Sequence, residues 1–190
     1  MLARCAIIWI IWRWAVLHDV WFCLIFKGRA YRAHDPRWSF QPTSGKGASI
    51  TGGRFNRVGQ EALYLALSPI TALAECTQGF AYRMLPLTLC EYDVDCADII
   101  DLTDPTMREA EGAVFEDMAC AWMTYQRASK IAPSQALAKA LIKKGYIGAV
   151  VPSFVPGIAE GATNLVLWRW GDRALNTVTV YDPDARLVKE

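Results

Sequence analysis

Short apolar runs alternate with polar segments along the chain. Residues 62–67 form an apolar run of the length that a buried strand needs. Ser68 and Pro69 follow as an N-cap and a first-turn proline, so we predict a helix from 70 to about 78, ended by Gly79. The same criteria predict further strands at 85–94, 98–102, 147–151, 164–170 and 177–181.

The remaining periodic segments are helical. Asp104 and Pro105 can begin a helical region that extends to about 125, and Ser134 can cap a helix over 135–144 that Gly145 ends. Strands and helices follow each other irregularly. This order predicts an α+β fold with short strands, rather than a regular parallel sheet.

The first 27 residues have a different pattern. Residues 6–14 and 20–26 are strongly apolar, but Arg13, His18 and Asp19 interrupt them. A membrane-spanning helix needs about 20 apolar residues with few charges. We therefore predict a packed arm or an oligomer contact of uncertain role for 1–27, and a single domain for 28–190.

Composition excludes several classes of protein. A hydrophobic content of 53% with 21% charged residues is typical of a folded soluble chain, and a net charge of +1 provides no general attraction for nucleic acid. The six cysteines form no C-x-x-C pair and there are only two histidines, so a zinc site is not expected. We interpret the cysteines as reduced thiols of a cytoplasmic protein.

The segment 44–56, SGKGASITGGRFN, contains four glycines with Lys46 and Arg54. Glycines beside cations indicate that the backbone approaches an anion. The spacing fits neither a Walker loop nor a dinucleotide fingerprint. A flexible surface loop, with Lys46 in solvent, is the alternative interpretation.

Three polar residues lie at the ends of apolar elements. Arg32 precedes a loop, Glu75 lies in the helix after the first apolar strand, and Ser153 follows a buried strand. Taken alone, each favours an ordinary role: a surface ion pair for Arg32, a solvated helix face for Glu75, and a turn or cap for Ser153. Together with the runs GGRFN, ALYLA and ALAE and the pairs Pro152-Ser153 and Asn164-Leu165, they resemble the RES domain, which is named after an Arg, a Glu and a Ser. The resemblance covers about 28–171.

The resemblance implies a function. RES proteins are toxins of bacterial type II toxin–antitoxin pairs, their fold is similar to that of the ADP-ribosyltransferases, and they consume NAD. The resemblance therefore implies short strands in two groups around a central NAD cleft, with helices outside. Hydrolysis, phosphorolysis and transfer of ADP-ribose to a protein all stay open, as does a non-catalytic NAD-binding module. The expected partner is an Xre-type antitoxin that covers the active site in a hetero-oligomer. No metal, direct nucleic-acid contact or membrane is expected.

The resemblance also assigns residues. The catalytic candidates are Arg32, Glu75 and Ser153, and the NAD-binding candidates are Arg32, Arg54, Tyr64, Asn56 and Asn164. A guanidinium can bind the NAD pyrophosphate through two parallel hydrogen bonds, which suits Arg32. Glu75 would stabilise positive charge on the ribose as the nicotinamide bond breaks. Ser153 would bind the nicotinamide or its ribose.

Each of the other NAD-binding candidates has two possible roles. Arg54 is either a second clamp or, the role we favour, a support that binds carbonyls or carboxylates around its loop. Tyr64 either stacks on a base of NAD or is a core residue. Asn56 and Asn164 are amides that either fix a loop or face the ligand.

Overall fold

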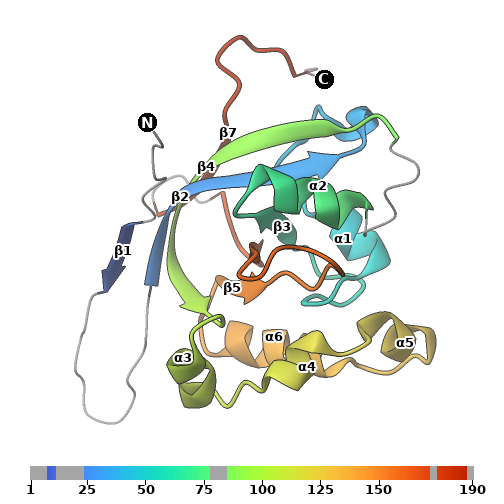
Figure 1. Ribbon diagram of the computed structural model, residues 1–190, viewed down its shortest axis with the longest axis vertical. Helices are drawn as coiled ribbons and strands as arrows, with labels where there is room; N and C mark the ends of the chain where they lie inside the picture. The colour runs from blue at the N-terminus through green and yellow to red at the C-terminus, as the bar shows by residue number, and fades with distance from the viewer. Residues whose placement is uncertain (1–7, 12–23, 78–84, 172–174, 188–190) are drawn as a thin grey trace.

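The computed structural model describes residues 8–11, 24–77, 85–171 and 175–187. Strands and helices are mixed along these segments, which confirms the predicted α+β class (Figure 1). The strands are β1 (Ile8–Ile11), β2 (Leu24–His34), β3 (Leu63–Ala66), β4 (Thr88–Asp101), β5 (Gly148–Pro152), β6 (Thr163–Leu167) and β7 (Asn176–Val180). The α-helices are α1 (Lys46–Thr51), α2 (Pro69–Thr77), α3 (Pro105–Ala110), α4 (Phe115–Ala119), α5 (Trp122–Arg127) and α6 (Pro133–Lys143), and a 3₁₀ turn covers Pro36–Trp38.

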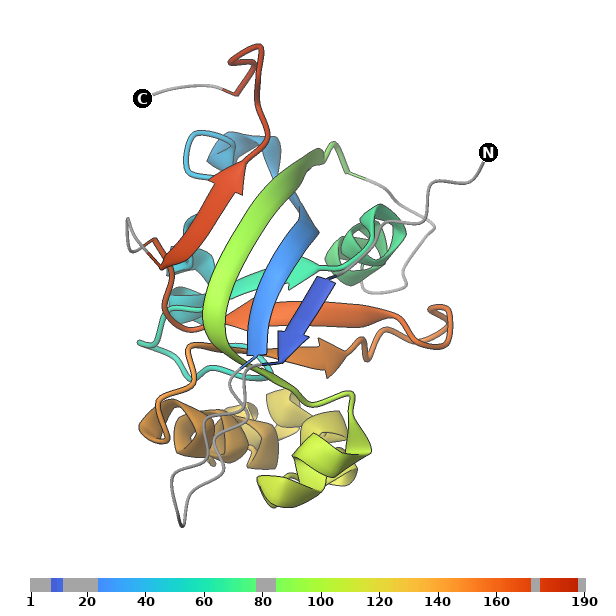
Figure 2. The ribbon, with the colours of Figure 1, turned by 90° about the vertical axis from the view of Figure 1, so that its left-hand side faces the viewer.

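All seven described strands join one sheet, in the order β1-β2-β3-β6-β5-β4-β7. Since β2 also pairs antiparallel with β4, the pairings close into a ring from β2 through β3, β6, β5 and β4 back to β2. Figure 2 shows the long, curved β2 and β4 side by side, with β5 and β6 crossing below them. The two strand groups that the resemblance implied are therefore joined through two long strands.

Alternate residues of these strands enter two cores, as the pleat of a strand requires. Val150 and Leu165 pack with Phe26 and Tyr92 between the strands of the ring. Their neighbours Val151 and Val166 face the other side and pack with residues of α4 and α6, such as Met118 and Leu141. In Figure 1 the helices α3 to α6 lie together below the strands, while α1 and α2 lie beside them.

Local signals placed several elements correctly. β3 occupies most of the predicted apolar run, and α2 begins at Pro69 with the Ser68 hydroxyl accepting a hydrogen bond from the Thr71 amide at 3.1 Å. Asp104 caps α3 in the same way by accepting from the Thr106 amide at 2.7 Å. The predicted stop of α2 at Gly79 lies outside the described residues.

Other predictions were wrong. The strands predicted at 85–94 and 98–102 are one strand, β4, in which Asp98 has a φ of 55°. Part of the glycine-rich segment forms the short helix α1. Ser134 does not cap α6, whose N-cap is Ala132. The Ser134 hydroxyl is instead buried and donates to the Arg54 carbonyl at 2.6 Å.

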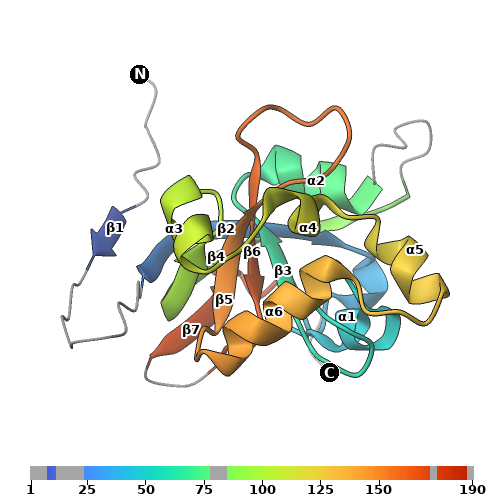
Figure 3. The same cartoon turned by 90° about the horizontal axis from the view of Figure 1, so that it is seen from below.

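Part of the N-terminal segment joins the sheet. β2 begins at Leu24, and both Leu24 and Phe26 are buried in the core, so the sheet extends across the predicted boundary at 28. β1 pairs antiparallel with β2 and lies at the edge of the molecule, far from α1 and α5 (Figure 3). Residues 1–7 and 12–23, with most of the tryptophans of this segment, lie outside the described residues. No described helix is long and apolar enough to cross a membrane.

Candidate active site

Two adjoining cavities lie around the C-terminal half of α2. The larger has a volume of about 430 Å³ and is bordered by α1, the Gly52–Phe55 loop, α5 and the segment after β5. The smaller has a volume of about 230 Å³ and is bordered by β2, β3 and α2. Three residues line both cavities, namely Tyr64, Glu75 and Asn164. These three side chains therefore mark where the cavities meet.

Glu75 is held by two donors. The Ser153 hydroxyl donates to Glu75 Oε1 at 2.7 Å, and Asn164 Nδ2 donates to the same oxygen at 2.5 Å. Among the described residues, no hydrogen bond to Glu75 Oε2 is found. The Asn164 Oδ1 atom is buried and also has no hydrogen-bond partner within the described part of the chain. The carboxylate is thus fixed in orientation with one oxygen left for a ligand.

Strand register brings Glu75, Ser153 and Asn164 together. Asn164 of β6 lies opposite both Ala66 of β3 and Val151 of β5. Ser153 follows β5 directly, and its amide continues the ladder by donating to the Ala162 carbonyl at 2.8 Å. The short turn after β3 starts α2, which carries Glu75 over the ends of these strands.

Arg32 lies in the smaller cavity. Its Nη1 donates to the carbonyls of Pro42 and Ser44 at 3.0 and 2.9 Å, and the Tyr92 hydroxyl donates to the same Pro42 carbonyl at 2.8 Å. Arg32 therefore holds the chain that leads into α1 while its side chain borders the cavity. It forms no salt bridge with a carboxylate of the described residues.

Arg54 lies in the larger cavity. Its Nη1 donates to the carbonyls of Met118 and Cys120 at 2.8 and 2.7 Å, and its guanidinium carbon lies 4.4 Å from the ring centroid of Phe154. Burial lowers the pKa of the Arg54 guanidinium below its ordinary value. Within the described residues, Arg54 has no carboxylate partner in a salt bridge.

Asn56 and Tyr64 stabilise the loop between the cavity and the core. Asn56 is 1% exposed, and its Nδ2 donates to the carbonyls of Ala48, Arg57 and Gln60. Its Oδ1 accepts from the Tyr64 hydroxyl at 2.8 Å. Asn56 lines neither cavity, so the structure places it as a loop-fixing amide and not as one that faces a ligand.

The Tyr64 hydroxyl is enclosed, whereas its ring borders both cavities. The hydroxyl accepts from the Phe55 amide at 3.0 Å, and burial raises the pKa of Tyr64 well above 10. Tyr64 therefore stays a neutral phenol whose hydrogen-bonding atoms are used inside the protein. Stacking of its ring on a base stays a prediction.

Packing against the protein explains several of the glycines. A Cβ atom on Gly53 would lie 2.6 Å from both Asn56 Oδ1 and the Tyr64 hydroxyl oxygen. A Cβ on Gly45 would lie 2.5 Å from the Trp170 ring. Gly47 has open space around it, and Lys46 is exposed to solvent. Tight contacts within the fold therefore account for part of the pattern that suggested an anion site.

The sequence was also compared with those of known protein families. The sequence profile of the RES domain matches residues 29–190. The chain belongs to the RES family. No curated protein sequence matches the chain.

The RES domain of this chain also has a structural relative. A chain in the crystal structure of the MbcT–MbcA toxin–antitoxin complex from M. tuberculosis superposes with a TM-score of 0.59 at 24% sequence identity. The match covers 83% of this chain and 82% of the other. The likeness shows that the two chains share a fold.

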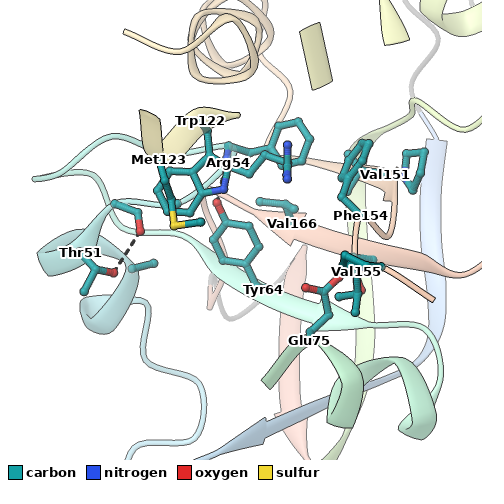
Figure 4. A pocket seen from close by; sticks show the side chains of 17 residues that line it. Thr51, Arg54, Tyr64, Glu75, Trp122, Met123, Val151, Phe154, Val155 and Val166 are labelled. Atoms are coloured by element: carbon teal, nitrogen blue, oxygen red, sulfur yellow. Dashed lines mark hydrogen bonds between the residues drawn. The ribbon is translucent and has the colours of Figure 1, made fainter. Parts of the chain in front are cut away.

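The sequence analysis did not identify several residues in and around the larger cavity. Trp122 and Met123 of α5 and Phe154 after β5 form an apolar wall of the larger cavity (Figure 4). Their hydrophobic spacing could not distinguish a cavity wall from a core. Gln135 at the start of α6 was missed as well: its Nε2 donates to the Gly53 and Asn56 carbonyls at 3.0 and 3.1 Å.

The smaller cavity also contains a thiol, that of Cys76. Cys76 lines the smaller cavity next to Glu75, and burial raises the pKa of its thiol despite the opposing effect of Arg32. It therefore lacks the lowered pKa of a reactive thiolate. Among the described residues, no group of three His, Cys, Asp or Glu side chains is placed to hold a metal ion.

Proposed function

We propose that this RES protein is the toxin of a toxin–antitoxin pair and cleaves the bond between nicotinamide and ribose in NAD. The observation that supports this most directly is the state of Glu75. One carboxylate oxygen is held by Ser153 and Asn164, and the other has no partner within the described chain. Arg32 and Arg54 supply positive charge on the two sides of this carboxylate, as a substrate with a diphosphate requires.

Each group has a defined part in the reaction. As the bond from ribose C1′ to the nicotinamide nitrogen breaks, its electron pair leaves with nicotinamide and the ribose becomes positively charged. The Glu75 carboxylate stabilises this charge and hydrogen-bonds a ribose hydroxyl through its free oxygen. Water, phosphate or a side chain of another protein then forms the new bond to C1′ and loses a proton where it carries one.

Ser153 and Asn164 act on Glu75. Both donate to the same oxygen, so both restrict the rotation of the carboxylate. In the absence of a ligand, the Ser153 hydroxyl is directed to Glu75. We therefore assign Ser153 a positioning role, with a direct contact to the nicotinamide side as a further prediction.

The second half of the proposal concerns a partner. A toxin needs restraint, and we propose a small Xre-type antitoxin that covers the larger cavity. Met123 on α5 lines this cavity and is 47% exposed, and Ile50 on α1, a helix that borders the cavity, is 75% exposed. Exposed apolar side chains at the mouth of a cavity suit a protein partner.

Incubation of purified, antitoxin-free protein with NAD tests the proposal. We expect free nicotinamide, with ADP-ribose when water is the acceptor, a phosphorylated ADP-ribose when phosphate is required, or a labelled protein when a protein accepts. Mass spectrometry with and without phosphate, and with candidate acceptor proteins, distinguishes these products. Folded protein that leaves NAD intact under all these conditions would contradict the proposal.

A further inference from the structure

We infer that the larger cavity binds the ADP half of NAD, with adenine against Trp122 and the diphosphate at Arg54. This inference rests on the proposed function and assigns the orientation of the substrate. It places the diphosphate at Arg54 instead of Arg32, the clamp that the family resemblance suggested. It gives a role to Trp122, which the sequence analysis did not name as a site residue. It also decides between the two roles that the sequence analysis left open for Arg54.

Size separates the two cavities. The ADP-ribose part of NAD is several times larger than nicotinamide. The larger cavity, about 430 Å³, falls within the range of ordinary ligand pockets, whereas the smaller, about 230 Å³, lies below it. Glu75 lines both. With the nicotinamide ribose at Glu75, the ADP half extends into the larger cavity and the nicotinamide ring into the smaller one.

Charge supports the same orientation. Arg54 is a half-buried cation that contacts two carbonyls and the Phe154 ring and forms no salt bridge with a carboxylate of the described residues. Buried charges in proteins are normally paired. The Gly52–Gly53 backbone lines the same cavity without side chains. A diphosphate at Arg54 would supply the missing negative charge.

Trp122 completes a site for a flat ring. It belongs to α5, in which no residue is fully buried, and it is absent from both hydrophobic cores. Figure 4 shows Trp122 and Met123 on the side of the cavity away from Glu75, with Arg54 and Tyr64 between them. Gln126 Nε2 donates to the Thr51 carbonyl at 2.8 Å and so fixes α5 against the glycine loop. We therefore place the adenine of NAD between Trp122 and this loop, which both line the larger cavity.

Titration calorimetry with ADP and with nicotinamide as separate probes tests the inference without requiring turnover. We expect Trp122→Ala to weaken ADP binding by about tenfold or more, since base stacking on an aromatic ring contributes that much, and Trp122→Phe to retain most of it. Nicotinamide binding should not change. Tyr125→Ala is the matched control, because Tyr125 lies on the same exposed helix and does not line the cavity.

Parent protein that does not bind ADP would overturn the inference, as would a Trp122→Ala variant that binds ADP within twofold of the parent. A Trp122→Ala variant that loses affinity for nicotinamide instead of ADP would also overturn it. The same holds for an Arg32→Gln variant that loses more ADP affinity than Trp122→Ala does. Unchanged ADP binding with weakened antitoxin binding would likewise reject it in favour of a protein contact at Trp122. Nicotinamide release from NAD by the parent protein, measured in parallel, tests the proposed function separately.

Discussion

The glycine-rich segment 44–56 and the cluster around Glu75 both carry residues of the RES pattern, yet they use them differently. In the segment, both the Nδ2 and the Oδ1 atoms of Asn56 form hydrogen bonds with other atoms of the protein. Gly53 has no side chain, which leaves room for the side chains of Tyr64 and Asn56. In the cluster, the protein holds one oxygen of Glu75 and leaves the other without a partner among the described residues.

The difference separates residues that build the site from residues that face the substrate. Substitution of a building residue should lower the stability of the fold with little effect on the chemistry of molecules that remain folded. Substitution of a residue of the cluster should do the reverse. Point substitutions in the two regions test this separation.

Asn56→Ala should cause the largest loss of stability. The substitution leaves buried carbonyls and the Tyr64 hydroxyl without their partner, and unsatisfied buried groups cost about 1–3 kcal/mol each. We expect the free energy of unfolding to fall by about 2–4 kcal/mol in urea titrations. Turnover per folded molecule should stay within a few-fold of the parent. A stable variant with abolished turnover would place Asn56 among the substrate-facing residues.

Two glycines of the segment should respond in opposite directions. A Cβ on Gly53 would lie 2.6 Å from two side-chain atoms, so Gly53→Ala should destabilise the fold by about 1–3 kcal/mol. Gly47 lies inside α1 with open space around it, so Gly47→Ala should stabilise it by about 0.5–1 kcal/mol. Thermal melts of the pair measure this. Equal effects at both positions would show that tight packing does not explain Gly53.

Ser153→Ala should have a smaller effect on turnover than loss of Glu75 itself. Asn164 still donates to Glu75 Oε1 after the change, so we expect a fall of about tenfold in turnover, the amount that one hydrogen bond to a charged group contributes. The double variant with Asn164→Ala should lose more than either single variant. If Ser153→Ala alone abolishes the reaction, Ser153 has a direct role that positioning of Glu75 does not provide.

The smallest effect is expected outside both regions, at the turn after β2. Hydrogen bonds from Arg37 lower the pKa of Asp35 from 3.8 to about 2. A lowered pKa in the folded state means that the pair stabilises the fold above the unfolded pKa and loses this contribution as pH falls through about 2. In Arg37→Ala, the midpoint of Asp35 in an NMR titration should return toward 3.8, with turnover unchanged. An unaltered midpoint would contradict this cause.

The sequence predicted those parts of the fold that depend on local signals. The apolar run of β3 and the caps Ser68 and Asp104 placed a strand and two helix starts correctly. β2 was missed because its Lys and Arg side chains interrupt the apolar pattern although Phe26 and Ala30 are fully buried.

The site was only partly predictable for a different reason. Glu75 and Ser153 are 78 positions apart, and Glu75 and Asn164 are 89 apart. The family resemblance named these residues, but only the pairing of β3, β6 and β5 brings them together. Whether an amide such as Asn56 faces inward or toward a ligand depends on tertiary contacts that no local pattern records.

The most direct test of the account compares NAD binding with NAD cleavage in Glu75→Gln. The substitution keeps the size of the side chain but removes the charge that stabilises the ribose as nicotinamide leaves. We predict a fall of at least about a hundredfold in the single-turnover rate, with NAD affinity from titration calorimetry close to that of the parent. Glu116→Gln, an exposed glutamate on α4, should change neither. A Glu75→Gln variant that cleaves NAD at the parent's rate would contradict the central claim.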